Sequence, residues 1–143
     1  MARMSIIFDG FADLADAIDK AGGDLKVAVD DALKDTQQVI QNNLTTGAAV
    51  YAAKGKKGYA TGAMYDSIIN DGQIIWKGTV AEVRVGFKLD AAGGFHSIFV
   101  MYGTPRMAKD TKVYNAIKGT KTRKEVAERQ ERIMQEHLAL AKG

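Results

Sequence analysis

The residues of this chain that can do acid–base or metal chemistry are few, and they are not arranged in catalytic patterns. His96 lies in an apolar run, and His137 lies in a polar segment with no acidic or histidine partner at metal-ligand spacing. Gly55-Lys56 is not part of a phosphate loop, because Val50 stands where such a loop has its first glycine and Lys57 where it has serine or threonine. Nucleophile-elbow and dinucleotide motifs do not occur either. We therefore expect no catalytic residue, no metal site and no cofactor, and a protein that is not an enzyme.

Clustered cations are the side chains with which this chain can bind a partner. Three lysines lie in a glycine-rich stretch between Tyr51 and Tyr59, and a second basic stretch runs from Thr104 to Lys124 with Asp110 as its one carboxylate. Aromatic and basic groups together hold single-stranded nucleic acid, and clustered cations alone neutralise phosphates. No helix-turn-helix, RRM or KH pattern accompanies them. The candidate residues for contact with a protein partner or with DNA are Lys54, Lys56, Lys57, Arg106, Lys109, Lys112, Lys121, Arg123 and Lys124.

The net charge of +3 hides an asymmetry along the chain. Residues 1–50 carry four basic side chains against eight aspartates, whereas the remainder carries sixteen basic and nine acidic side chains. Such polarity steers one copy of a protein onto another, or onto DNA, although two solvated faces would give the same pattern.

Length and composition fit one globular domain over residues 1–143, with a core from about residue 4 to 117. The chain has no cysteine, which excludes disulfides and thiolate metal sites. No apolar run reaches the roughly 18 residues of a membrane span, and the first residues are too short an apolar stretch for a secretory signal. We expect a protein that is made in a cytoplasm and does not bind membranes.

The N-terminal elements predicted from the pattern are a short strand from Met4 to Phe8 and one long helix from about Phe11 to Leu44. The helix has apolar residues three or four positions apart, while its aspartates lie mostly off this stripe and are expected to face water. Gly22-Gly23 interrupts the pattern and predicts a kink or a break. Residues 45–60 are expected to form a mobile basic loop.

A small sheet and short helices are predicted for the middle of the chain. Thr61 is a candidate N-cap for a helix through Ile68. Strands are predicted at Gln73 to Lys77 and, by alternation, at Val83 to Phe87, with a turn at Gly78-Thr79. Phe95 to Tyr102 has helical spacing but is short enough to be a strand.

Two elements are predicted at the end of the chain. Val113 to Ile117 would form a helical turn on the core, and Thr122 to Lys142 a polar helix. Because its apolar edge is thin, we expect this last helix to fray or to pack on a neighbouring subunit. The fold class is α+β, a long N-terminal helix packed on a small antiparallel sheet, with short helices and a C-terminal helix.

The order of these features resembles the family of small neck and tail-completion proteins of long-tailed bacteriophages, the "gene product ten-like" tail components. The matching motifs are Ser5-Ile6-Ile7-Phe8-Asp9-Gly10-Phe11 with Leu14, then Thr61-Gly62-Ala63-Met64-Tyr65-Asp66-Ser67-Ile68, then Val83 to Phe87, and Phe99-Val100-Met101-Tyr102-Gly103-Thr104. The resemblance covers about Ser5 to Ile117. Met101 departs from the family, which often has an acidic residue before that aromatic, and Val113-Tyr114 stands where a proline-phenylalanine-leucine run is frequent.

The resemblance implies a structural virion protein of the head–tail neck or tail-completion (tail terminator-like) assembly, made in the bacterial host cytoplasm. It implies a homo-oligomeric ring, with a hexamer expected for a six-fold tail, that joins the head connector to the tail. Its expected partners are further copies of itself, head-closure proteins, tail-tube or tail-terminator proteins, and DNA in the channel. A cytoplasmic nucleic-acid-binding accessory protein is the alternative.

Overall fold

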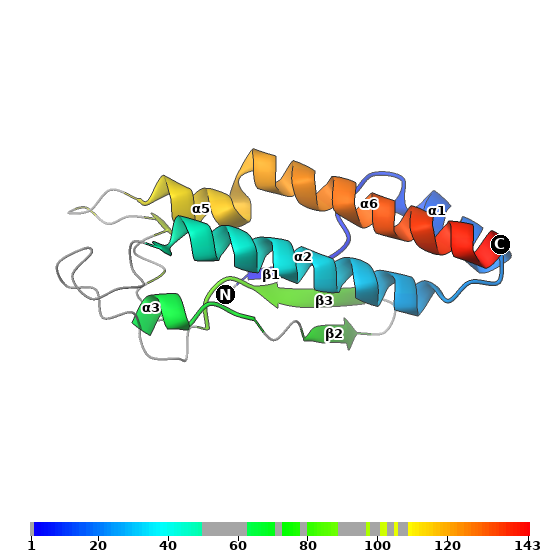
Figure 1. The fold of residues 1–143 in the computed structure, drawn as a ribbon, viewed down its shortest axis with the longest axis horizontal. Coiled ribbons are helices and arrows are strands. Elements are labelled where there is room, and N and C mark those ends of the chain that lie inside the picture. The colour runs from blue at the N-terminus through cyan, green and yellow to red at the C-terminus, as the bar shows by residue number, and fades with distance from the viewer. Residues whose placement is uncertain are drawn as a thin grey trace.

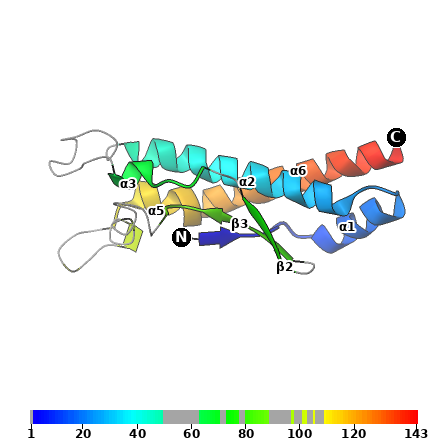
Figure 2. The same cartoon turned by 90° about the horizontal axis from the view of Figure 1, so that it is seen from below.

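The computed structural model describes residues 2–49, 63–70, 73–77, 80–88, 97, 101–102, 105 and 109–143. In this part of the chain the central helix α2 (Leu25–Gly47) has a small sheet on one side and helices α5 (Thr111–Lys118) and α6 (Thr120–Lys142) on the other (Figure 1). Helices α2 and α6 run antiparallel along the long axis of the molecule, as both Figure 1 and Figure 2 show. The predicted α+β class is confirmed.

The single long helix predicted over residues 11–44 is two helices with a break at Gly22-Gly23, one of the two outcomes expected there. Helix α1 (Phe11–Lys20) ends just before Gly22, whose φ of 81° is the left-handed conformation that favours glycine after a helix. The carboxylate of Asp24 then caps α2 by accepting a 3.2 Å bond from the Val27 amide. Helix α2 continues to Gly47, so residues 45–47 are helical and not part of the predicted loop. Of the rest of that loop, Ala48 caps the helix and Ala49 follows it, while residues 50–60 lie outside the described residues.

The first strand is β1 (Ala2–Met4), and the prediction of a strand over Met4 to Phe8 is wrong. The cause is Gln130 of α6, whose Oε1 accepts a 2.8 Å bond from the Ile7 amide and whose Nε2 donates to the Ser5 carbonyl at 3.1 Å. A side chain thereby takes the backbone groups that a longer strand would offer to the sheet. Phe8 remains buried, and its ring packs edge-to-face on Phe11 with centroids 5.9 Å apart.

The sheet among the described residues has the order β1–β3–β2 with both pairs antiparallel. Strand β2 (Ile74–Lys77) confirms the prediction for residues 73–77 to within one residue, and the predicted turn at 78–79 lies outside the described residues. Strand β3 (Val80–Val85) begins and ends earlier than predicted. It ends because Gly86 takes a φ of 103°, after which Phe87 forms an isolated antiparallel bridge with Ile68.

The helix predicted from Thr61 to Ile68 is shorter in the structure. Helix α3 (Ala63–Asp66) stops where the Ser67 hydroxyl donates a 2.6 Å bond to the Met64 carbonyl, and Ile68 already forms the isolated bridge with Phe87. The proposed cap Thr61 lies outside the described residues. Of the segment predicted from Phe95 to Tyr102, residues 97, 101 and 102 are described, and they are helical.

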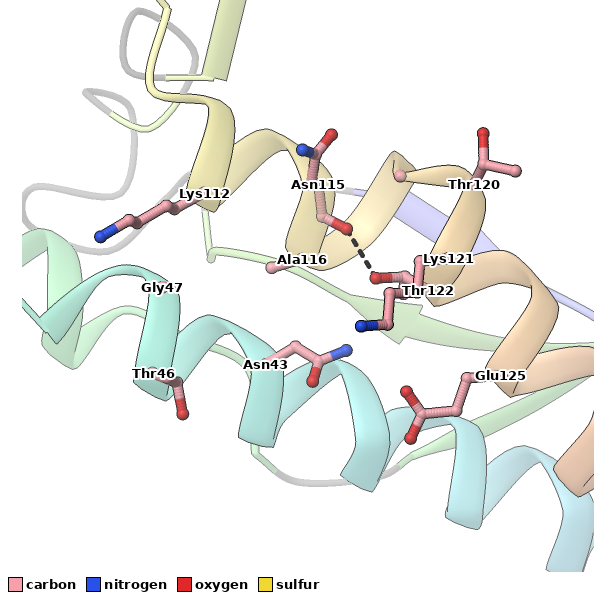
Figure 3. A pocket seen from close by; sticks show the side chains of 11 residues that line it. Asn43, Thr46, Gly47, Lys112, Asn115, Ala116, Thr120, Lys121, Thr122 and Glu125 are labelled. Atoms are coloured by element: carbon pink, nitrogen blue, oxygen red, sulfur yellow. Dashed lines mark hydrogen bonds between the residues drawn. The ribbon is translucent and has the colours of Figure 1, made fainter.

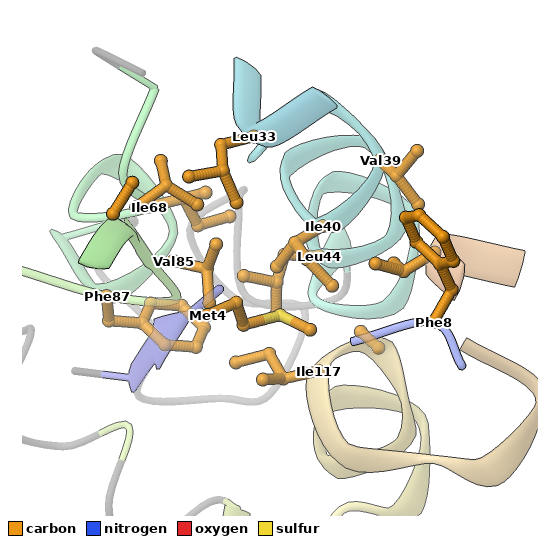
Figure 4. Packing of buried hydrophobic residues seen from close by; sticks show 14 of the residues in the cluster. Met4, Phe8, Leu33, Val39, Ile40, Leu44, Ile68, Val85, Phe87 and Ile117 are labelled. Carbon is orange, nitrogen blue, oxygen red and sulfur yellow. The ribbon is translucent and has the colours of Figure 1, made fainter. Parts of the chain in front are cut away.

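The core lies between α2 and the elements on both of its sides. Leu33, Ile40 and Leu44 of α2 pack against Val85 and Phe87 from the sheet side, and against Ile117 of α5 (Figure 4). Fully buried Val126 and Met134 of α6 belong to the same cluster. The core therefore extends beyond the predicted limit of residue 117, since α6 supplies part of it.

The two C-terminal helices differ in how well they were predicted. Helix α5 buries Val113 and Ile117, which confirms the predicted helical turn docked on the core. The prediction that the polar last helix frays or packs on another subunit is wrong, because α6 packs along α2 of its own chain. Helix α6 packs through a narrow row of buried side chains, which are Thr122, Val126, Gln130 and Met134. This row is sufficient to hold α6 on the domain because Thr122 and Gln130 also form hydrogen bonds with other parts of the chain.

Candidate functional site

The sharp corner between α5 and α6 positions most of the described cations of the second basic stretch. The carboxylate of Asp110 caps α5 by accepting bonds from the amides of Lys112 at 3.0 Å and Val113 at 3.3 Å. Gly119 ends α5 and starts α6, and a Cβ there would lie 2.7 Å from the Asn115 carbonyl oxygen. The Thr122 hydroxyl donates to the same carbonyl at 2.6 Å. The corner is therefore closed by short contacts that fix the directions of the two helices.

An open groove of about 860 Å³, lined mainly by residues with polar side chains, lies between this corner and the C-terminal part of α2. Figure 3 shows Asn43 of α2 and Lys121 of α6 converging on the groove, with Lys112 toward one end and Glu125 toward the other. The lining residues are Asn43, Thr46, Gly47, Lys112, Asn115, Ala116, Gly119, Thr120, Lys121, Thr122 and Glu125. Amides, hydroxyls and two ammonium groups give the groove hydrogen-bond donors for a partner that carries carboxylates or phosphates.

The structure brings five of the nine candidate contact residues to this end of the molecule: Lys109, Lys112, Lys121, Arg123 and Lys124. All five are exposed, and neither they nor Lys118 form an ion pair with any described residue. Lys54, Lys56, Lys57 and Arg106 lie outside the described residues. We call residues 109–124 the basic end. It holds six cations and one carboxylate, Asp110, whose oxygen is used in capping α5.

Two tyrosines, Tyr102 and Tyr114, are in contact with each other at the basic end. The rings of Tyr102 and Tyr114 meet edge-to-face with centroids 6.0 Å apart, and Tyr102 is 54% exposed. The ammonium of Lys109 lies 4.3 Å from the Tyr114 centroid and that of Lys118 lies 5.3 Å from the Tyr102 centroid. A hydrogen bond with Tyr102 raises the pKa of Lys118 above its usual value.

Tyr102, Tyr114 and Lys118 were not among the residues selected from the sequence, nor were Asn43 and Thr46 of the groove. A signal existed for Lys118, which lies within the basic stretch. None existed for the α2 residues, because only the packing of α5 and α6 against α2 brings them to the groove.

The opposite end of the molecule is acidic. Residues 9–24, which contain α1 and the turn into α2, carry five aspartates and one lysine, and we call them the acidic end. All five aspartates are exposed. Asp16 pairs with Lys20 at 2.9 Å, whereas Asp9, Asp13 and Asp19 form no ion pair with a described residue. Figure 1 places α1 beside the C-terminus and α5 at the far end of the long axis.

The aspartates between the two ends, Asp30, Asp31 and Asp35, have partners within the chain. The prediction that the helical aspartates mostly face water is confirmed, because among the aspartates of α1 and α2 only Asp30 and Asp35 are not exposed. Arg129 of α6 forms a bidentate pair with Asp35, with both nitrogen–oxygen distances 2.8 Å. This pair raises the pKa of Arg129 above its already high usual value. His137 Nε2 lies 2.8 Å from an oxygen of Asp31, and Trp76 Nε1 donates to Asp30 at 2.9 Å. His137 therefore has an acidic partner that its spacing in the sequence did not reveal.

No protein-family model, curated protein or solved structure matches this chain. Within the described ranges no helix is both long and apolar enough to cross a bilayer. Over the same ranges no three histidine, aspartate or glutamate side chains are grouped in a way that would hold a metal ion. The resemblance to phage neck proteins stays a prediction, and the groove with its cations is the candidate site of this chain.

Proposed function

We propose that this protein is a non-enzymatic structural subunit of the head–tail neck or tail-completion assembly of a long-tailed bacteriophage, where it forms a ring between the head connector and the tail. The residues that carry the resemblance support this proposal, because motifs far apart in the sequence meet in one core. Phe8, Met64, Ile68, Val85 and Phe87 all belong to the same buried cluster. The motifs are thus parts of one packing arrangement.

The observation that carries the proposal is the basic end. The basic end has six cations without ion pairs among the described residues, and two of them, Lys112 and Lys121, line the groove at a rigid corner of the fold. Salt bridges within the chain would neutralise such cations if their task were stability alone, as Arg129 and Asp35 demonstrate one helical turn farther along α6. Unpaired, fixed cations favour contact with an anionic partner. In a neck this partner would be another subunit, a neighbouring ring or the DNA in the channel.

The experiment that tests the proposal is localisation in the virion. Particles of the phage that encodes this chain are labelled with an antibody against it and imaged by electron microscopy. Label at the junction of head and tail is the expected result, and loss of the protein should leave separate heads and tails. Intact particles that lack the protein would contradict the proposal.

The tyrosines at the basic end favour a second candidate function, that of a cytoplasmic nucleic-acid-binding accessory protein. The half-exposed ring of Tyr102 beside Lys118 is the combination of aromatic and basic groups that holds single strands. Gel filtration with light scattering, with and without duplex or single-stranded DNA, separates the two. An oligomer of fixed stoichiometry without DNA favours the neck subunit, and association only with DNA favours the accessory protein.

A further inference from the structure

Among the described residues, unpaired aspartates gather at one end of the molecule and unpaired cations at the other, and the two ends are too far apart to neutralise each other. Helix α2 starts at the acidic end and finishes at the groove, and its 23 residues span about 34 Å at roughly 1.5 Å per residue. The Debye length at physiological ionic strength is only about 8 Å. Each end therefore presents its charge to a partner almost independently of the other.

We propose that the acidic end of one copy docks on the basic end of the next, so that copies associate head to tail with the groove as part of the contact. The inference rests on the proposed function for the closure of these contacts into a ring. A head-to-tail contact requires two different complementary surfaces on every copy, and it closes into a ring when the rotation between copies allows. The described residues provide both surfaces on one chain, with five aspartates against one lysine at one end and six cations against one carboxylate at the other.

The composition of the groove favours a protein partner over a nucleic acid. Glu125 lies in the groove with Lys112 and Lys121, and its carboxylate would repel a run of phosphates. The acidic end is itself mixed, because the exposed Asp16 and Lys20 form a pair at its surface. The acidic end, with several carboxylates and one ammonium group, therefore complements the basic end and its groove, where Glu125 lies with two ammonium groups. It does so better than the uniformly anionic backbone of a nucleic acid.

The test exchanges the charges of the two ends. The basic-end variant is Lys112→Glu with Lys121→Glu, and the acidic-end variant is Asp13→Lys with Asp19→Lys. All four side chains are exposed and form no ion pair with a described residue, so circular dichroism and melting temperature should stay unchanged. Association is followed by sedimentation velocity at about 0.1 M and about 1 M salt, where the Debye length falls from about 10 to about 3 Å.

The wild type should associate at the lower salt and dissociate at the higher. Each double variant should lose about tenfold or more in association constant, since attraction becomes like-charge repulsion. An equal mixture of the two variants should associate again, because each then finds an opposite charge on the other. The matched control is Lys34→Glu with Arg132→Glu. It changes the net charge by as much as the basic-end variant does, but at two exposed cations that lie between the two ends, so its association should be that of the wild type.

Three results would overturn the inference. The first is a wild type that stays monomeric up to about 1 mM, which is the concentration scale of the weakest specific contacts. The second is a mixture that does not regain association, and the third is a control that loses as much association as the basic-end variant. Loss of binding to a labelled DNA duplex in the basic-end variant, with self-association unchanged, would assign the groove to nucleic acid instead. Label at the virion neck together with any of these results would leave the proposed function standing without this contact.

Discussion

Gln130 offers the sharpest test of how this fold holds its N-terminal segment. Its side chain is fully buried and bonds the Ile7 amide, the Ser5 carbonyl and the Thr36 hydroxyl. Gln130→Met keeps the length and approximate volume of the side chain but removes both polar atoms. The Ile7 amide and the Ser5 carbonyl, which are partly buried, would then lose their partner.

The magnitude follows from those two backbone groups. An unsatisfied buried group costs about 1–3 kcal/mol, and partial burial places each in the lower half of that range, so we expect a loss of roughly 2–4 kcal/mol in the free energy of unfolding. For 143 residues and about 2.1 cal/mol/K of unfolding entropy per residue, this lowers the melting temperature by roughly 7–13 °C.

Urea denaturation and hydrogen exchange together measure the effect. The midpoint should fall without a change in slope, and the Ile7 amide should lose protection more than amides in the middle of α2. Gln38→Met is the matched control, because the Gln38 side chain is exposed and bonds only the Asn42 side chain at 2.9 Å; it should stay within about 0.5 kcal/mol of wild type. If Gln130→Met were equally mild, the bonds of Gln130 would not be what draws residues 5–7 away from the sheet.

Two further predictions concern the basic end and its corner. Tyr102→Phe removes the hydrogen bond that raises the pKa of Lys118, so the pKa measured by NMR titration of the Lys118 ammonium should move toward the usual value of 10.5. Because the pKa is raised in the folded state, the small stabilisation of the fold is complete below pH 10.5 and is lost as the pH rises through the raised pKa. A titration that is unchanged in the variant would contradict the hydrogen bond. Gly119→Ala places a Cβ 2.7 Å from the Asn115 carbonyl oxygen and should lower the free energy of unfolding, measured by urea denaturation, by about 1–3 kcal/mol. The control Gly22→Ala should cost less, roughly 1 kcal/mol, because only its positive φ opposes the new side chain and no atom lies in contact with it. Equal losses in the two variants would show that the corner relaxes around the new Cβ.

The elements that the sequence predicted well are those whose signals are local. The break at Gly22-Gly23, the buried stripe on α2 and the helix around Val113 depend on residues within one or two turns of one another. The extent of α6 was also predicted to within two residues at its start. Periodicity and glycine placement fix such features before any tertiary contact forms.

The elements that were predicted wrongly depend on contacts across the chain. The Ile7 amide bonds a side chain 123 residues away, and no pattern near the first strand reveals that competitor. The packing of α6 on α2 was missed for a similar reason, since buried Thr122 and Gln130 count as polar in any hydrophobic pattern but are satisfied inside. Polar residues that are buried with partners are invisible to a pattern that scores only apolar positions.

The candidate site was half predictable. The run of cations from Lys109 to Lys124 is evident in the sequence, but the groove needs Asn43 and Thr46, which come from another helix. The tyrosine pair likewise joins residues twelve positions apart across a segment whose path the sequence does not specify. Composition therefore identified the charge of the site, and tertiary packing determined its shape.

The same packing determines which of the charged side chains stay available for a partner, out of the acidic residues 1–50 and the basic remainder of the chain. The acidic part of this charge asymmetry comes from the eight aspartates of residues 1–50. Three of them, Asp30, Asp31 and Asp35, meet Trp76, His137 and Arg129 in the body of the molecule. Partly buried pairs of this kind orient α6 on α2 and leave little field outside. Carboxylates remain unpaired on α1, and cations remain unpaired around the α5–α6 corner, at the two ends of α2. Reversing the charge of Asp30, Asp31 or Asp35 should therefore lower stability, whereas reversing charges at either end should change association and leave stability intact.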